Sequence, residues 1–316
     1  MAIELLELHY HLSDNSHAMS AVVRNRSEAE ALAVCLHIAA ELGIPLQLES
    51  SAFAEGGLRE TWQFIGQNNA QLSLLLAVIV LVFSRLPISD SEMDVLNKEV
   101  AKATIQEKKL NIEKLKRELD EGVPKQETIA ATARALEHDL KVVTRRSNFY
   151  RELLDYDKVT AVGFTPIPDP AVKPNEEHTV QRHDFAKFVL STDKLPVEVV
   201  DDARIEIVAP VLKEGTYLWK GIYEGQPISF SMLDQEFKTA VIRREVSFLN
   251  GSTIDCVLNV QRKFDEVGDI NITGYSVATV LSKSDGNSFE ETAQGKRYRF
   301  NKRLAAGQGH LFDQTP

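Results

Sequence analysis

Alternating apolar and polar residues at the start of the chain predict a strand. In "IELLELHYHL", four apolar residues on one face alternate with three polar residues on the other. The apolar residues are Leu6, Leu8, Tyr10 and Leu12, and the polar residues are Glu7, His9 and His11. Residues 17–23 predict a second strand, a capping box at Ser27 predicts a helix that ends at Leu42, and residues 44–49 predict a third strand. We therefore expect a small α+β domain of order ββαβ over residues 1–57.

Residues 58–88 predict one long helix whose second half is strongly apolar. No charged residue occurs from Thr61 to Ser84, and Leu72 to Phe83 reads "LSLLLAVIVLVF". A helix that is apolar on every side must be surrounded, either by other copies of the chain or by lipid. The residues expected at this contact are Leu72, Leu75, Leu76, Ile79, Val82 and Phe83.

The length of this apolar run decides between the two surroundings. Its twelve residues fall short of the roughly twenty that a bilayer requires. We therefore favour a homo-oligomer core in a cytoplasmic protein. The alternative is an inner-membrane helix, in which case the excess of Lys and Arg after Leu86 would place the C-terminal part in the cytoplasm.

Residues 89–157 predict an α-helical coiled-coil hairpin. A capping box at Ser89 opens a charged helix that ends near Glu121, and Gly122 to Pro124 break it. The second helix, residues 125–155, carries apolar residues at heptad spacing. Its expected contact face includes Ile129, Leu136, Leu140 and Val143.

The C-terminal half predicts a proline-rich linker, a barrel and a tail. Four prolines within nine residues mark residues 158–182 as a linker. Residues 183–283 read as βββαββ, the element order of an OB-like barrel, with an SH3-like barrel as the alternative. Residues 284–316, rich in Gly, Ser, Gln and charge, predict a flexible tail. The fold class is therefore α+β, with a small N-terminal domain, helices and a C-terminal small β-barrel.

Charge changes how the barrel is interpreted. An OB-like barrel could bind single-stranded nucleic acid by stacking bases on Tyr217, Trp219, Tyr223 and Phe230. However, residues 197–290 hold nine basic and fifteen acidic residues, and the 316-residue chain has a net charge of −10. A phosphate-binding groove needs the opposite bias, so we favour a protein-binding or structural barrel. The two cysteines, Cys35 and Cys256, lie in separate predicted domains, which fits a reducing compartment better than a disulfide.

Candidate chemistry is sparse. His9 and His11 could hold zinc, but they lie on the polar face and the spacing supplies no third ligand, so exposed histidines are expected. His183 beside Asp184 is not expected to form a catalytic dyad, because neighbouring helical residues point apart. The common nucleotide-binding, hydrolase and metalloprotease motifs are absent from the sequence. The sequence therefore predicts no catalytic, cofactor-binding or metal-ligating residue and no enzyme.

Two stretches of the tail could bind a partner. "GKRYRFNKR" carries a basic patch that either offsets the acidic body or binds phosphate or lipid headgroups. Its basic residues are Lys296, Arg297, Arg299, Lys302 and Arg303. Gln308, Leu311 and Phe312 resemble the Q-x-x-L-F peptide by which bacterial replication-associated proteins dock on the sliding clamp.

A wider resemblance rests on "YLWKGIYEGQPISFSMLDQEFKTAV" and the stretch from "FLNGSTIDC" to "GYSVATVL". It is similar to the C-terminal module of uncharacterised bacterial proteins met in mobile-element and phage-defence neighbourhoods. The resemblance implies an apolar helix and a charged coiled coil before the module, and no reaction, ligand or site residues.

Together these features predict a non-enzymatic, homo-oligomeric assembly or adaptor protein with an unknown protein partner, such as a component of a phage-defence system. The alternatives are a membrane-anchored effector or sensor and a single-stranded nucleic acid binder.

Overall fold

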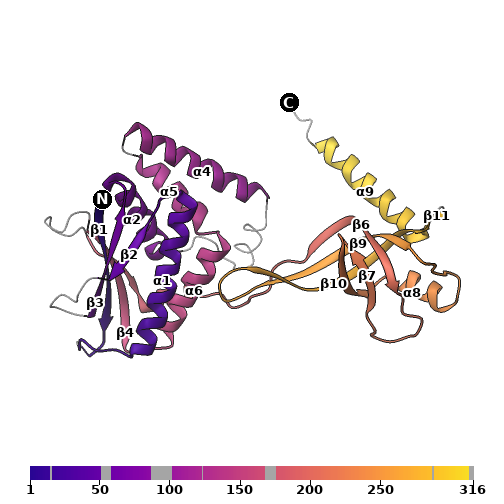
Figure 1. Cartoon of the computed structure of the whole chain (residues 1–316), viewed down its shortest axis with the longest axis horizontal. Helices are drawn as coiled ribbons and strands as arrows, with labels where there is room; N and C mark the ends of the chain where they lie inside the picture. Colours follow the sequence, from indigo (N-terminus) through magenta and orange to yellow (C-terminus); the bar gives the residue numbers. More distant parts are fainter. Residues whose placement is uncertain are drawn as a thin grey trace. The chain divides into compact units, whose positions relative to one another are not determined.

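The computed structural model describes residues 1–14, 16–50, 58–86, 102–122, 124–167, 176–286 and 288–312. The chain forms two compact units (Figure 1). The first contains residues 1–193 and 264–269, and the second contains residues 194–263 and 270 onward.

The first unit is built on a five-stranded antiparallel sheet of order β2-β3-β1-β4-β5. Its strands are β1 (Ala2–Leu12), β2 (Gln47–Ser50), β3 (Leu58–Gly66), β4 (Val159–Ile167) and β5 (His178–Gln181). The alternation expected along β1 is confirmed, since Leu6, Leu8 and Tyr10 are buried while the residues between them are half-buried on the other face. β1 thus has an inner, core-forming face and an outer, polar face.

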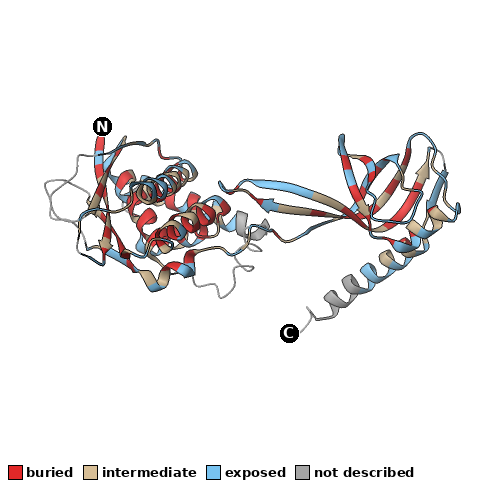
Figure 2. Cartoon of the chain, turned by 90° about the horizontal axis from the view of Figure 1, so that it is seen from below, coloured by how far each residue is buried: buried red, intermediate tan, exposed pale blue. Residues whose placement is uncertain are grey.

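Helices cover the inner face of this sheet, and the core lies between the two layers (Figures 1 and 2). They are α1 (Ala21–Leu42), α2 (Asn69–Ser84), α4 (Lys102–Glu121), α5 (Gln126–Leu136), α6 (Leu140–Leu154), α7 (Arg182–Phe185) and the short 3₁₀ helix η1 (Ala186–Phe188). The expected end of α1 is confirmed, because Gly43 follows Leu42 with a left-handed φ of 66°.

The prediction of one long apolar helix over residues 58–88 is wrong. Residues 58–66 form β3, in which Glu60, Trp62 and Phe64 alternate with residues on the outer face. The helix begins only at Asn69, after the Asn68 side chain accepts a hydrogen bond from the Gln71 backbone N–H at 2.9 Å. In the described residues no helix has the length and apolar character needed to cross a membrane.

The strongly apolar helix α2 is enclosed by the chain itself. It packs against β1, β3, β4 and β5 and against α1 and α5, and nine of its residues are buried. Its last turn also finds partners inside the unit. The Arg146 guanidinium donates to the Val82 carbonyl at 2.8 Å, and the Tyr150 hydroxyl donates to the Phe83 carbonyl at 2.6 Å. These bonds satisfy carbonyls that a helix end otherwise leaves without partners.

The predicted coiled-coil hairpin is also wrong in its second arm. Residues 125–155 form two helices, α5 and α6, with a break at residues 137–139. Asp139 caps α6 by accepting hydrogen bonds from the backbone N–H groups of Lys141 and Val142. α5 pairs with α4, whereas α6 packs against α1. The predicted first arm ends at Glu121, as α4 does; its first part, residues 89–101, lies outside the described residues.

Smaller expectations also need correction. Residues 17–20 are not a strand, and α1 begins at Ala21 rather than at Ser27, whose hydroxyl is buried against Tyr10. The third strand, β2, starts at Gln47. The predicted linker contains β4 and β5, while residues 168–175 lie outside the described residues.

The second unit is a closed five-stranded barrel, as the small-barrel prediction expected. Its elements are β6 (Glu198–Ala209), β7 (Trp219–Tyr223), β8 (Gln226–Met232), α8 (Gln235–Ile242), β9 (Ser252–Phe264) and β10 (Ile270–Asp285). The strands run in the order β10-β8-β7-β6-β9, and β9 pairs with β10 to close the ring. β8 and β10 are parallel, and the other recorded barrel pairs are antiparallel.

The predicted flexible tail is instead ordered over most of its length. β11 (Ser288–Glu291) pairs with β10, and helix α9 (Ala293–Phe312) follows. Thr292 caps this helix, accepting a hydrogen bond from the Gly295 backbone N–H at 2.9 Å. Gly295 allows the first turn to approach β10, because a Cβ there would lie 2.2 Å from the Leu281 carbonyl oxygen.

Candidate functional site

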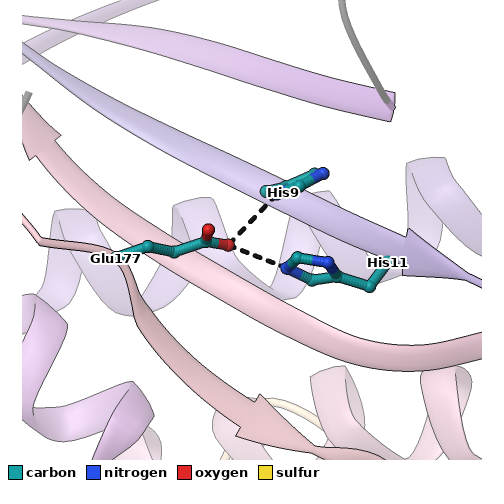
Figure 3. Close-up of side chains that lie close together, drawn as sticks. All are labelled: His9, His11 and Glu177. Atoms are coloured by element: carbon teal, nitrogen blue, oxygen red, sulfur yellow. Dashed lines mark hydrogen bonds and ion pairs between the residues drawn. The ribbon is translucent and has the colours of Figure 1, made fainter.

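A histidine pair and a glutamate meet on the outer face of the N-terminal sheet (Figure 3). His9 and His11 are two residues apart on β1, so both side chains leave the same face. Glu177 is the residue just before β5, the strand that pairs with β4 on the side away from β1. In the register of the sheet, His9 lies opposite Gly163, and Gly163 lies opposite Thr179. The sheet therefore places the three side chains together although they are far apart in sequence.

One carboxylate oxygen of Glu177 contacts both rings. It lies 3.1 Å from His9 Nδ1 and 2.9 Å from His11 Nε2. The two ring centroids are 3.9 Å apart at 45°. The side chains of His9, His11 and Glu177 are 13%, 34% and 31% exposed, so the cluster is partly shielded but open to solvent.

The backbone is shaped to admit the Glu177 carboxylate. A Cβ at residue 163 would lie 1.6 Å from Glu177 Oε1 and 2.5 Å from its Cδ, so only glycine leaves this space open. Gly163 needs no unusual backbone angle, so room for the carboxylate is the local reason for a glycine in the middle of β4.

The electrostatics of the cluster differ between its members. Burial, followed by the charge of His11, lowers the pKa of His9. Burial would raise the pKa of Glu177, but the hydrogen bond from His11 and the two imidazole charges outweigh it and lower that pKa. Arg59, opposite His9 on β3, is paired with Glu7 at 2.8 Å. The glutamate is therefore an anion with two imidazoles aimed at it.

A second cluster joins three helices of the first unit. Asp139 accepts from His37 Nε2 at 3.0 Å and from Lys108 Nζ at 2.7 Å, and Lys108 also lies 3.3 Å from Glu41. Here the Lys108 ammonium already supplies the cation between the two carboxylates. This cluster ties α1, α4 and α6 together and is best explained as structural.

The residues expected on an association helix and a coiled-coil face all lie inside the first unit. Leu72, Leu75, Leu76, Ile79, Val82 and Phe83 are buried, as are Ile129, Leu136, Leu140 and Val143. Phe83 stacks on Phe164 with ring centroids 5.0 Å apart, so the end of α2 packs directly on the sheet. These side chains form core rather than an exposed surface of this chain.

The basic patch of the tail is largely paired with acids of the barrel. Arg297 contacts Glu236, Arg299 Nη1 lies 2.8 Å from Glu291 Oε1, and Lys302 Nζ lies 2.7 Å from Asp201 Oδ2. Lys296 and Arg303 are on the same helix. The backbone of α9 extends through Gln308, Leu311 and Phe312, but their side chains lie outside the described residues.

Two of the four aromatics considered for base stacking are unavailable. Trp219 and Phe230 are fully buried in the barrel core. Tyr217 is 65% exposed, and Tyr223 is half-buried with its ring edge-on to Tyr275. The barrel thus offers little aromatic surface on which successive bases could stack.

The connection between β6 and β7, residues 210–218, exposes several apolar side chains. The exposed apolar residues of this β6–β7 loop are Leu212, Tyr217 and Leu218, and Val208 is exposed near the end of β6. The loop is held in place at Gly215, whose carbonyl accepts a hydrogen bond from Lys238 of α8 at 2.8 Å. The Tyr217 ring packs over Gly215, where a Cβ would lie only 2.8 Å from the ring. Exposed apolar side chains gathered on one loop are typical of a contact surface.

Comparisons with protein-family models, curated proteins and solved structures found no match to this chain.

Sequence reasoning missed Glu177 and Gly163. The alternation of β1 correctly places His9 and His11 on one face, but Glu177 lies 166 positions from His11 and follows residues interpreted as a linker. The usable signal was the glycine in the strand-like "KVTAVGF", because a glycine inside a strand often marks a close approach.

Proposed function

We propose that the protein is a non-enzymatic adaptor that binds a protein partner through the β6–β7 loop of its C-terminal barrel. The observation that carries this proposal is the set of exposed apolar side chains on that loop. Leu212 and Tyr217 are each 65% exposed, although Trp219, the residue that begins β7, is fully buried. Apolar residues gathered on one loop supply contact area for a protein partner.

The topology of the barrel supports this position for a binding surface. The order βββαββ, closed by β9 and β10, fits an OB-like barrel. In that fold the loops between strands one and two and between strands four and five carry ligands. The β6–β7 loop is the first of these two connections.

Charge favours a protein over a nucleic acid as the partner. The region of residues 197–290 is acidic, with nine basic and fifteen acidic residues. Three of the five basic residues of α9, namely Arg297, Arg299 and Lys302, are already paired with acidic residues. A surface that neutralises phosphates needs cations in excess, so the nucleic acid alternative is weakened.

The original support for homo-oligomerisation no longer applies. α2 and the helices expected to form a coiled coil are both used inside the first unit. The adaptor role therefore rests on the barrel loop, and membrane anchoring through α2 is not part of the proposal.

The test compares three bait proteins that carry the full chain. The loop variant replaces Leu212, Tyr217 and Leu218 with serine, and the control is Phe300→Ser, which removes an exposed aromatic from α9 of the same unit. We expect a partner that wild type and Phe300→Ser retain and the loop variant loses, with equal melting temperatures and with the same pattern when the partner is purified. Equal retention by all three baits would contradict the proposal.

A further inference from the structure

We propose that His9, His11 and Glu177 form a binding site for a divalent transition-metal ion, with zinc as the best match. The site lies on the outer face of the N-terminal sheet and is independent of the barrel loop proposed to bind a partner.

The ligand chemistry fits zinc. Two imidazole nitrogens and one carboxylate oxygen form a His₂Glu set, which binds zinc in some hydrolytic metalloproteins. Imidazole suits Zn²⁺ and its neighbours in the transition series, whereas Mg²⁺ and Ca²⁺ prefer oxygen ligands alone. Three protein ligands on a partly exposed face also leave a coordination position for water.

The three ligand atoms are close enough to share one ion. All lie within 4.8 Å of one another, and two of the separations are 2.9 and 3.1 Å. Metal bonds of about 2.0–2.2 Å place tetrahedral ligand atoms roughly 3.3–3.6 Å apart. Small rotations of the His9 and His11 rings and of the flexible Glu177 side chain would therefore admit the ion without backbone movement.

The site is built into the sheet rather than formed by chance among surface side chains. β1 supplies both histidines from alternate positions of one strand, which fixes them on the same face. Gly163, directly opposite His9, leaves the space that the Glu177 carboxylate fills. A lone ion pair needs only one imidazole, and two protonated rings 3.9 Å apart would repel each other. A dication instead attracts all three groups at once.

The surrounding charges permit a cation. Arg59 is the cation nearest to His9 in the register of the sheet, and its charge is offset by Glu7 at 2.8 Å. The negative charge of Glu177 is therefore not offset by Arg59 and is available to the ion. The His37–Glu41–Asp139 cluster differs, because the Lys108 ammonium occupies the position a metal would take.

Bound metal would link β1 to the residue that precedes β5, across β4. Because the folded sheet brings these ligands together and an unfolded chain does not, metal binding should stabilise the first unit.

The test is calorimetric titration of the metal-stripped full-length chain with zinc chloride, together with the visible spectrum of the cobalt-loaded chain. We expect one ion per chain at this site and cobalt bands of low coordination number. Glu177→Gln keeps the side-chain shape, and His11→Ala removes one ring. Each should weaken binding by about 10–100-fold or more and remove the cobalt bands, while the melting temperature without metal stays close to that of wild type.

The matched controls are His183→Ala, an exposed histidine beside Asp184, and His37→Ala in the second cluster. Both should leave this binding event unchanged. No zinc uptake by the wild type, wild-type binding by Glu177→Gln and His11→Ala, or loss of binding only in His37→Ala would each overturn the assignment.

Discussion

At the scale of single residues, Gly163 decides whether the His9–His11–Glu177 cluster can form. A methyl group at this position would overlap the end of the Glu177 side chain rather than any backbone atom. The glutamate can rotate away at small cost to the fold, but it then leaves the histidines. A substitution at Gly163 is therefore expected to disrupt the cluster while leaving the stability of the sheet nearly unchanged.

The first prediction concerns Gly163→Ala. It should weaken zinc binding by about tenfold or more, because the carboxylate is displaced, while the protein stays folded. Calorimetry and thermal melting measure the two effects. Gly274→Ala, a strand glycine of the barrel whose Cβ would meet only the end of Gln261, is the control and should bind zinc as wild type does. Unchanged zinc affinity in Gly163→Ala would contradict the account of this residue.

Asp139 is the residue that joins the helices. It caps α6 and accepts hydrogen bonds from His37 and Lys108. Burial would raise the pKa of this carboxyl, but the bonds from His37 and Lys108 outweigh burial and hold that pKa well below its usual range. A carboxyl whose pKa is lower in the folded state stabilises the fold above its unfolded pKa of about 3.9 and loses that contribution as the pH falls through the folded value.

The second prediction is therefore that Asp139→Asn lowers the free energy of unfolding by about 1–3 kcal/mol at neutral pH, since it leaves the half-buried Lys108 and His37 partly unsatisfied. The difference from wild type should shrink as the pH falls below about 4. Urea unfolding over this pH range measures both. Asp157→Asn, an exposed carboxylate paired with Arg182, should cost about 0–1 kcal/mol. A pH-independent difference for Asp139→Asn would refute this interpretation.

At the scale of elements, the sequence predicted structure best where a segment shows one regular pattern of apolar and polar residues. β1 and the end of α1 follow from alternation and from Gly43, and the barrel follows from its element order. β3 was missed because its residues from Thr61 onward are uncharged and run into the apolar stretch, although Trp62 and Phe64 already alternate with polar or less buried residues. The break before α6 was missed because the heptad spacing continues from Leu136 to Leu140 across it.

Enclosure of α2 depends on elements that are distant in sequence, so local pattern could not reveal it. β4, β5 and α5 supply much of its surroundings, and all follow it by more than forty residues. Gly66 at the end of β3 and Asn68 before α2 were the available sign that two elements meet there.

The third prediction concerns the centre of α2. Val78→Lys places a charge where the side chain is fully buried between sheet and helices, so it should cost several kcal/mol and unfold the first unit. Circular dichroism during thermal unfolding measures this. Ala70→Lys, at the exposed start of the same helix, should melt close to the wild type. Equal melting of the two variants would show that α2 is not core.

The fourth prediction concerns how α9 attaches to the barrel. Gly295→Ala would press a methyl group against the Leu281 backbone, so it should release the first turns of α9. Arg297→Ala combined with Lys302→Ala removes only exposed ion pairs, which solvent screens, and should have a much smaller effect. Hydrogen exchange of residues 293–304 distinguishes them. Stronger release by the ion-pair variant would mean that charge, rather than close packing, holds the helix.

At the scale of the whole molecule, each of the two units carries a different candidate site. The first unit uses its most apolar segment as its own core and presents the histidine–glutamate cluster on the other side of the sheet. The second unit exposes apolar side chains on the β6–β7 loop. Association is therefore expected at the barrel loop, and α2 should be protected whether or not the chain has a partner.

The most direct measurement is hydrogen exchange of residues 72–83 in the wild-type chain, compared between a concentrated sample and one diluted until the chain reaches its smallest species. Because α2 is enclosed by the sheet, α1 and α5 of the same chain, its amides should be equally and strongly protected in both samples. Protection that falls as the chain is diluted would contradict the account, since it would mean that other copies of the chain complete the core around α2.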